Sequence, residues 1–299
     1  MIRLPFRQPF DWSSLVEFLS VRATPGVEAV DADSYRRTLS LGGAYGTLEV
    51  RRIVRRNFLE LHIDFPEPGA FPEIVERVRH IFDLDTDPRA VSRHLRRDPR
   101  LASLIDRYPG LRVPGAWDGF ELAVRAILGQ QVSVKAATTL AGRLADAYGK
   151  KMPDASSGDL EVLFPSAEML AKVEPSKLGG LGLPRSRAQA ILRLADSVRR
   201  RDVVFDRTVE LNTFEGQLTK VPGIGAWTAQ YVAMRALGQP DAFPVTDLGL
   251  LKGGSSGSCA LEPKTLLRRA EKWRPFRAYA AMYLWKSYGI KLSRRVTKR

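Results

Sequence analysis

The sequence contains one cysteine, three histidines and no long apolar run, and each scarcity excludes a class of protein. A single cysteine, Cys259, cannot form an internal disulfide or supply a multi-cysteine zinc or iron–sulfur site, so a reducing compartment is favoured. His62, His80 and His94 lack the H-x-x-x-H and H-E-x-x-H spacings of zinc sites. We therefore interpret the three histidines as ordinary surface or structural residues.

The first residues of the chain do not form a continuous apolar segment, because Pro5, Arg7, Pro9 and Asp11 interrupt it. This pattern argues against a secretory signal, and no later apolar run reaches membrane-spanning length. We expect a cytoplasmic protein that does not enter the membrane.

Acidic residues are scarce relative to basic ones, with 33 aspartates and glutamates against 47 lysines and arginines, a net charge of +14. Such an excess favours a polyanionic partner, although a generally basic surface is an alternative that charge alone leaves open. With 299 residues, 44% of them hydrophobic, the chain is long enough for two or three ordered domains.

The periodicity of apolar residues divides the chain into two parts. Between residues 34 and 65 apolar and polar residues alternate as in strands, and helices are expected at 12–23 and 72–82. These elements predict a small α+β domain over residues 1–90. Beyond it the strand signal disappears, and helix-period segments are expected at 119–130, 133–148, 167–173, 186–200, 213–219, 226–237, 247–252, 264–272 and 276–288. The fold class is therefore α+β, a small N-terminal α/β sheet domain followed by an all-helical part over residues 91–299.

Two stretches within the helical part predict loops. One runs from 151 to 159, and the other is GGSSGS at 253–258. The second resembles an engineered linker, although a natural loop is the simpler interpretation.

The most specific local motif is LTKVPGIGAWTA at 218–229, within a helix–hairpin–helix at 213–237. Gly223 and Gly225 permit a tight turn whose amides can approach a phosphate, and the helix beginning near Ala226 adds its positive N-terminal dipole. Such a turn would bind the DNA backbone without recognising sequence. A glycine turn that simply joins two helices is the alternative.

The segment DAFPVTDLGLLK at 241–252 follows the hairpin and places Asp247 at the start of an apolar helical turn. From spacing alone, Asp247 is a helix N-cap alongside Thr246. A capping carboxylate can also be a reactive one, so both roles stay open.

Five collinear segments resemble the helix–hairpin–helix DNA glycosylases, in particular the bacterial 3-methyladenine branch. They are PFDWSSLVEFLSVRA at 9–23, RVPGAWDGFELAVRAILGQQVSVKAA at 112–137, VPGIGAWTAQYVAMRA at 221–236, FPVTDLGLLK at 243–252 and KWRPFRAYAAMYLW at 272–285. The resemblance covers nearly the whole chain and implies a glycosylase core of two helical subdomains flanking a DNA cleft.

The implied function is that of a monofunctional DNA glycosylase in base excision repair. Such an enzyme flips 3-methyladenine or 7-methylguanine out of double-stranded DNA and hydrolyses the N-glycosidic bond, leaving an abasic site. The resemblance makes Asp247 the catalytic carboxylate. Trp227 stands where lyase members of the family carry a Schiff-base lysine, so no lyase activity is expected. The implied partner is duplex DNA containing alkylated bases, bound by a monomer.

The resemblance also implies a pocket for the flipped base, formed by Phe18, Trp227, Tyr231 and Trp285, with Leu248 at its mouth where the family has a tyrosine. Each aromatic side chain could instead be ordinary core. A flipped base stacks on aromatic rings, and a cationic base gains extra attraction from them.

The implied DNA contacts are Gly223, Gly225, Ala226, Thr228, Gln130 and Gln131. Gln131 occupies the wedge position where the family has leucine, although two glutamines at a helix end could form a solvated turn. The carbonyls of Thr219, Val221 and Ile224 are implied ligands of a structural monovalent cation or magnesium ion, and no organic cofactor is required.

Two other functions stay open, a related glycosylase for deaminated or oxidised bases and a non-catalytic protein that binds damaged DNA. The acidic residue at 247 argues against the second. The absence of lysine at 227 argues against a lyase form of the first.

Overall fold

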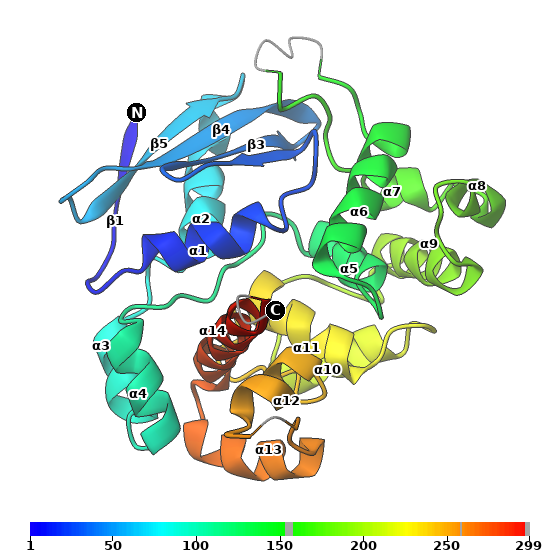
Figure 1. Cartoon of the computed structure of the whole chain (residues 1–299). Helices are drawn as coiled ribbons and strands as arrows, with labels where there is room; N and C mark the ends of the chain where they lie inside the picture. The colour runs from blue at the N-terminus through cyan, green and yellow to red at the C-terminus, as the bar shows by residue number, and fades with distance from the viewer. Residues whose placement is uncertain (153–157, 258, 297–299) are drawn as a thin grey trace.

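The computed structural model describes residues 1–152, 158–257 and 259–296, without the side chains of 290–296, and shows a sheet domain beside a helical body (Figure 1). The sheet has five strands in the order β1-β5-β4-β3-β2, and every neighbouring pair is antiparallel. The strands are β1 (Ile2–Pro5), β2 (Glu28–Val30), β3 (Ser34–Leu41), β4 (Ala44–Arg52) and β5 (Phe58–Asp64).

The alternating residues form strands because one face of the sheet is covered. Leu48 and Val50 of β4 and Leu59 and Leu61 of β5 are buried in a core with helices α1 (Trp12–Ser20) and α2 (Phe71–Ile81). The predicted strands within 34–65 and the α+β fold class are thus confirmed. Strands β1 and β2 were not predicted because three or four residues are too few to show a period.

Apart from η1 (Pro68–Ala70), which packs beside α2 in the sheet domain, the remaining helices form the helical body. In chain order they are α3 (Pro88–Leu95), α4 (Pro99–Arg107), α5 (Gly119–Leu128), α6 (Val134–Tyr148), α7 (Ala167–Leu170), α8 (Pro175–Gly179), α9 (Arg185–Arg199), α10 (Leu211–Thr219), α11 (Ala226–Ala236), α12 (Leu248–Gly254), α13 (Pro263–Ala270), η2 (Glu271–Trp273) and α14 (Arg277–Val296). None of the described helices is long and apolar enough to cross a membrane.

Helices α3 and α4 lie in a region for which no element was expected. Asp87 and Asp98 cap them by accepting hydrogen bonds from the next backbone N–H groups, and a proline follows each cap. An aspartate before a proline is a sequence signal for a helix start, so these helices were detectable.

The prediction of a loop over 253–258 is wrong at its first two residues. Gly253 and Gly254 are buried in the last turn of α12, and a Cβ on Gly253 would lie 2.1 Å from the carbonyl oxygen of Leu284 in α14. The two glycines are therefore needed for close packing of two helices. Ser258 lies outside the described residues, as do 153–157 of the other predicted loop.

The two parts of the molecule have separate cores, but they meet around the candidate site. Trp117 joins the core of the sheet domain, whereas Val91 and most later apolar residues join that of the helical body. Figure 1 shows α1, below the sheet, facing the helices α11 and α14. Side chains from both parts therefore contribute to one site.

Candidate active site

The carboxylate of Asp247 is held by three hydrogen-bond donors. Its Oδ1 accepts from the indole N–H of Trp285 at 2.8 Å and from the backbone N–H of Leu250 at 3.0 Å, while Oδ2 accepts from the indole N–H of Trp227 at 3.0 Å. Asp247 is thus the N-cap of α12, as its spacing predicts, and it also touches two of the predicted pocket residues. Within the described part of the chain, it forms no ion pair with a lysine or arginine.

Gly249 makes this arrangement possible, although sequence reasoning did not single it out. A Cβ at this position would lie 2.9 Å from Cδ1 of Trp285 and 3.0 Å from Oδ1 of Asp247. Any larger residue would push the indole away from the carboxylate. A glycine two residues after a candidate catalytic aspartate was the available signal.

The four predicted pocket aromatics form a continuous group of rings. Trp227 and Tyr231 stack with centroids 5.3 Å apart and planes 7° from parallel, as their spacing on α11 allows. Trp285 of α14 lies 6.3 Å from Tyr231 and 6.4 Å from Phe18 of α1. All four side chains are partly exposed, which distinguishes them from core aromatics such as Trp12. Leu248 is 56% exposed beside Asp247 at the start of α12.

Two arginines that the sequence analysis did not select also contact these rings. The Arg22 guanidinium carbon lies 3.7 Å from the Phe18 ring centroid, and that of Arg235 lies 4.9 Å from the same centroid. Arg235 also donates a 2.8 Å hydrogen bond to the Tyr231 hydroxyl. Their signal in the sequence was weak, because a chain with 47 basic residues offers many arginines near aromatics.

The two glycines of the hairpin between α10 and α11 differ in backbone conformation and in the space around them, although the motif contains both. Gly223 has a φ of +99°, and a Cβ there would lie 2.7 Å from Cβ of Ala190, so glycine is required. Gly225 has an ordinary φ of −100°, and a Cβ at this position would have no neighbour within 4 Å. Gly223, Gly225 and Ala226 are exposed, which leaves the start of α11 open to a phosphate.

Gln130, at the end of α5, connects this hairpin to the turn between α5 and α6. Its side-chain amide donates hydrogen bonds to the carbonyl of Gly223 at 3.2 Å and to the hydroxyl of Thr228 at 3.3 Å. Arg187 of α9 donates to the Gln130 carbonyl. Thr228 is only 2% exposed, so its side chain supports the hairpin from inside rather than facing DNA.

Gln131 projects from the α5–α6 turn in a left-handed backbone conformation, with a φ of +56°. Glutamine rarely adopts this conformation, and such strain concentrates at functional positions. Gln131 and the next four residues are exposed. An exposed residue on a turn is compatible with the wedge position, which stays a prediction.

The carbonyls predicted to hold a cation belong to the end of α10 and the hairpin. That of Val221 accepts a hydrogen bond from the N–H of Ile224 at 3.0 Å, which leaves it one lone pair for a cation. Among the described residues, no group of three histidine, cysteine or acidic side chains forms a metal site.

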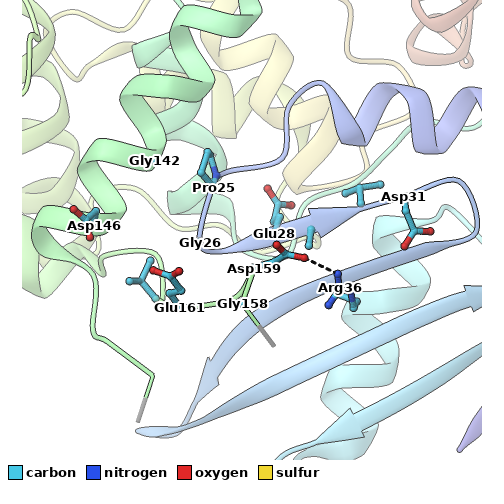
Figure 2. Close-up of a pocket in the computed structure, with 13 residues that line it drawn as sticks. Pro25, Gly26, Glu28, Asp31, Arg36, Gly142, Asp146, Gly158, Asp159 and Glu161 are labelled. Carbon is cyan, nitrogen blue, oxygen red and sulfur yellow. Dashed lines mark hydrogen bonds and ion pairs between the residues drawn. The ribbon is translucent and has the colours of Figure 1, made fainter. Parts of the chain in front are cut away.

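Two hollows on the described part of the chain do not include Asp247 in their lining. Figure 2 shows one of them, between the sheet and α6, lined by residues that include Asp31, Asp146, Asp159 and Glu161. It has a volume of about 620 Å³, and Asp159 pairs there with Arg36 at 3.0 Å. Its acidic lining would repel nucleic acid. Another, of about 530 Å³, is lined in part by Trp227 and Thr246.

Comparison with known proteins identifies the family. The AlkA N-terminal domain model matches residues 1–118, and that of the HhH-GPD superfamily base excision DNA repair proteins matches 124–265. The chain is 34% identical to DNA-3-methyladenine glycosylase 2 of Escherichia coli over 97% of its own length and 98% of the relative's. The chain belongs to the HhH-GPD superfamily.

Two further similarities agree with this family. A Mycobacterium tuberculosis relative named "Probable bifunctional transcriptional activator/DNA repair enzyme AlkA" is 39% identical over 95% of the chain, which spans only 56% of that relative's length. The 3-methyladenine DNA glycosylase of Archaeoglobus fulgidus has the same fold, with a TM-score of 0.84 at 23% identity over 95% of this chain and 97% of that one. The predicted family and the predicted order of a sheet domain and a helical glycosylase core are confirmed.

Proposed function

We propose that this HhH-GPD protein is a monofunctional DNA glycosylase that removes alkylated bases of the 3-methyladenine and 7-methylguanine type from double-stranded DNA. The observation that carries the proposal is the hydrogen bonding of one carboxylate, Asp247, to two indoles that belong to a partly exposed aromatic group. The relatives named as 3-methyladenine glycosylases support the same choice of substrate.

The chemistry needs a single negative charge next to the sugar. When the bond between C1′ and the base nitrogen breaks, its electron pair leaves with the base and positive charge develops on the sugar. The Asp247 carboxylate, oriented by Trp227 and Trp285, stabilises that charge, and a water then adds to C1′ and loses a proton. An N3- or N7-alkylated purine already carries a positive charge, so it leaves as a neutral base without a strong general acid.

The aromatic group gives the flipped base a place to stack, since Phe18, Tyr231 and Trp285 come from three helices that converge beside Asp247. Trp227 cannot form a Schiff base, so we propose that the product is an abasic site and that the strand stays intact.

The DNA backbone is held by the hairpin, in this proposal, through the exposed amides at the start of α11 and the turn at Gly223. The carbonyls of Thr219, Val221 and Ile224 would hold a cation that neutralises a nearby phosphate. Gln131 would fill the space that the flipped nucleotide leaves. We propose a monomer that works in the cytoplasm.

The direct test is to incubate methylated duplex DNA with the protein and to identify the released bases by chromatography. We expect free 3-methyladenine and 7-methylguanine, and strand breaks only after alkali or an abasic-site nuclease is added. Release of oxidised or deaminated bases alone would assign another lesion class. Binding without release would make the protein a damage sensor, and spontaneous strand scission would make it a lyase.

The hairpin offers a separate test with a matched control. Gly223→Ala forces a Cβ against Ala190 at a positive φ, whereas Gly225→Ala places one in open space. We expect Gly223→Ala to weaken binding to all duplexes by about tenfold, with a reduced dependence on salt concentration, and Gly225→Ala to have a much smaller effect. Equal weakening by both, measured by fluorescence anisotropy, would contradict this assignment.

A further inference from the structure

Two positive charges lie against the aromatic group at the end remote from Asp247. Arg22 lies 3.7 Å over the ring of Phe18, and Arg235 lies 4.9 Å from that ring and 5.5 Å from that of Tyr231. Arg235 is 3% exposed and donates to the carbonyls of Pro114 and Gly115, so its position is well determined by the surrounding backbone. Arg22 donates to the Phe18 carbonyl at 3.1 Å.

These two charges lack the carboxylate partners that neighbouring arginines have. Arg37 and Arg125 pair with Glu28 and Glu121 at distances of 2.7 to 3.9 Å. Throughout the described residues, by contrast, Arg22 and Arg235 bond to carbonyl and phenol oxygens and form no ion pair.

The electrostatic effect of these arginines is visible on their neighbours. Burial lowers the pKa of Arg22, and the positive charge of Arg235 lowers it further. Burial favours a raised pKa for Tyr231, but the charges of Arg235 and Arg22 outweigh it and lower the pKa of the phenol. The rings of Phe18 and Tyr231 therefore lie in a positive potential.

The negative charge of the site lies at the other end of the same aromatic group. Asp247 accepts from Trp227, Trp227 stacks on Tyr231, and Tyr231 accepts from Arg235. The rings thus separate a carboxylate from two guanidinium groups. A base among these rings would lie toward the arginines, with its sugar beside the carboxylate.

We propose that Arg22 and Arg235 determine lesion specificity by stabilising the electrons that a departing base receives, and so extend excision to bases that are neutral before they leave. This inference rests on the proposed active site. Cleavage moves the electron pair of the C1′–N bond onto the base nitrogen, so the base becomes more negative by one charge while the sugar becomes more positive. The arginines attract the first charge, and Asp247 attracts the second.

The consequence differs between two classes of lesion. A neutral base, such as hypoxanthine, enters the positive potential without penalty and gains stabilisation as negative charge develops, before it takes a proton from solvent. The arginines repel a cationic base, such as 7-methylguanine, when it enters the site. This repulsion is removed when the base becomes neutral during cleavage, so the arginines have little net effect on the rate from free protein and free DNA. The arginines therefore accelerate the excision of neutral bases selectively.

Arg22→Gln tests this role because an amide keeps a donor for the Phe18 carbonyl but removes the charge. Single-turnover excision is measured at protein concentrations well below saturation, so that the rate includes entry of the base into the site. The two duplexes differ only in the lesion, hypoxanthine or 7-methylguanine. We expect hypoxanthine release to fall by about 10- to 100-fold and 7-methylguanine release to change by less than about threefold. Arg22→Lys should restore most of the hypoxanthine rate, since it restores the charge.

The control is Arg51→Met, which removes one positive charge from a side chain that is 63% exposed on β4, and it should leave both rates unchanged. Equal losses on both lesions would indicate a merely structural role and overturn the proposal. Unchanged rates on both, or a wild-type protein without activity on hypoxanthine, would overturn it as well. If Arg22→Gln does not fold, as judged by circular dichroism, Arg22→Met is measured in its place.

The outcome is distinguishable from a failure of the proposed function. Full activity of an Asp247→Asn variant would overturn the active site itself. An inactive Asp247→Asn together with an unaltered Arg22→Gln would leave that site in place and reject only the role of the arginines.

Discussion

An aspartate that accepts hydrogen bonds from tryptophan lies near each end of helix α12, but within the residues that the structure describes only one of the two carboxylates is paired with an arginine. At the N-terminal end, Asp247 accepts from the indoles of Trp227 and Trp285. Near the C-terminal end, Asp98 accepts from the indole of Trp273 at 3.1 Å, but also from Arg269 at 2.7 and 2.8 Å. A capping aspartate that accepts from tryptophan thus occurs at both places, so this feature alone does not distinguish the proposed catalytic residue.

The difference lies in the arginines. Burial favours a raised pKa for Asp98, but the hydrogen bonds and charge of Arg269 outweigh it and lower the pKa to about 2. Arg269 and Arg100 also donate to the carbonyls of Gly253, Gly254 and Ser255, where they complement the negative end of the helix dipole. The Asp98 charge is therefore neutralised within the protein, whereas that of Asp247 is available to a substrate.

The largest effect should come from exchanging the two carboxylates for amides. Asp247→Asn can still cap α12 but removes the charge, so single-turnover release of 7-methylguanine should fall on the order of 10²- to 10³-fold while binding to abasic-site DNA persists. Asp98→Asn is the matched control and should lower thermal stability without this loss. Comparable losses of excision in both variants would erase the distinction between the two ends.

Removing the indole N–H donor beside Asp247 should have a smaller effect on excision, and the indole beside Asp98 provides the control. Trp285→Phe keeps a ring but removes a donor that orients Asp247, and excision should slow by about tenfold. The slowing should vanish when Asp247→Asn is already present, because the donor then has no charge to orient. Trp273→Phe should instead affect only the free energy of unfolding. An undiminished effect of Trp285→Phe in the double variant would show that the indole acts on the base alone.

Gly249→Ala tests whether excision depends on the close approach of the Asp247 carboxylate to the Trp285 indole. The added methyl group must displace Trp285 or Asp247, and we expect excision to slow by about threefold to tenfold with little change in melting temperature. Gly257→Ala, with only the Ser255 hydroxyl at 3.9 Å from its Cβ, is the control in the same region. A wild-type rate for Gly249→Ala would mean that the close approach is unnecessary for chemistry.

The smallest effect concerns acid stability. Because the folded-state pKa of Asp98 is lowered to about 2, its contribution is fully present above the unfolded-state value of 3.8 and is lost as the pH falls from there toward 2. After allowance for screening by solvent, the contribution is about 1 kcal/mol. Urea unfolding at pH 5 and at pH 2.5 should show this loss for the wild type and a shallower one for Asp98→Asn. Parallel pH dependences would assign the stability to other carboxylates.

The parts of the site that local patterns describe could be predicted, and those that arise from packing could not. The spacing of Trp227 and Tyr231, the capping position of Asp247 and the hairpin at Gly223 all depend on neighbours in the sequence. Arg22 and Arg235 lie together only because both contact the ring of Phe18 in the folded chain. The local sequence pattern does not indicate this tertiary contact.

The same division applies to the fold. The strands with a clear alternation of apolar and polar residues were predicted. Strand β1 was not, because it is defined by its pairing with β5, which is far away in the chain. Helices α3 and α4 were missed although the sequence marks them. Each starts at an Asp–Pro pair, Asp87–Pro88 or Asp98–Pro99, and each has two buried apolar residues four positions apart. The last two residues of α12 were assigned to a loop on composition alone, which ignores what lies 2.1 Å away.

Gly253 has a consequence for protein engineering. A six-residue stretch of glycine and serine suggests a convenient place for a tag, a label or an insertion, yet its first residue lies against the backbone of the helix that carries Trp285. An insertion there would move the two halves of the site relative to each other. Position 257 has room for a new side chain and is the better place for a reporter group.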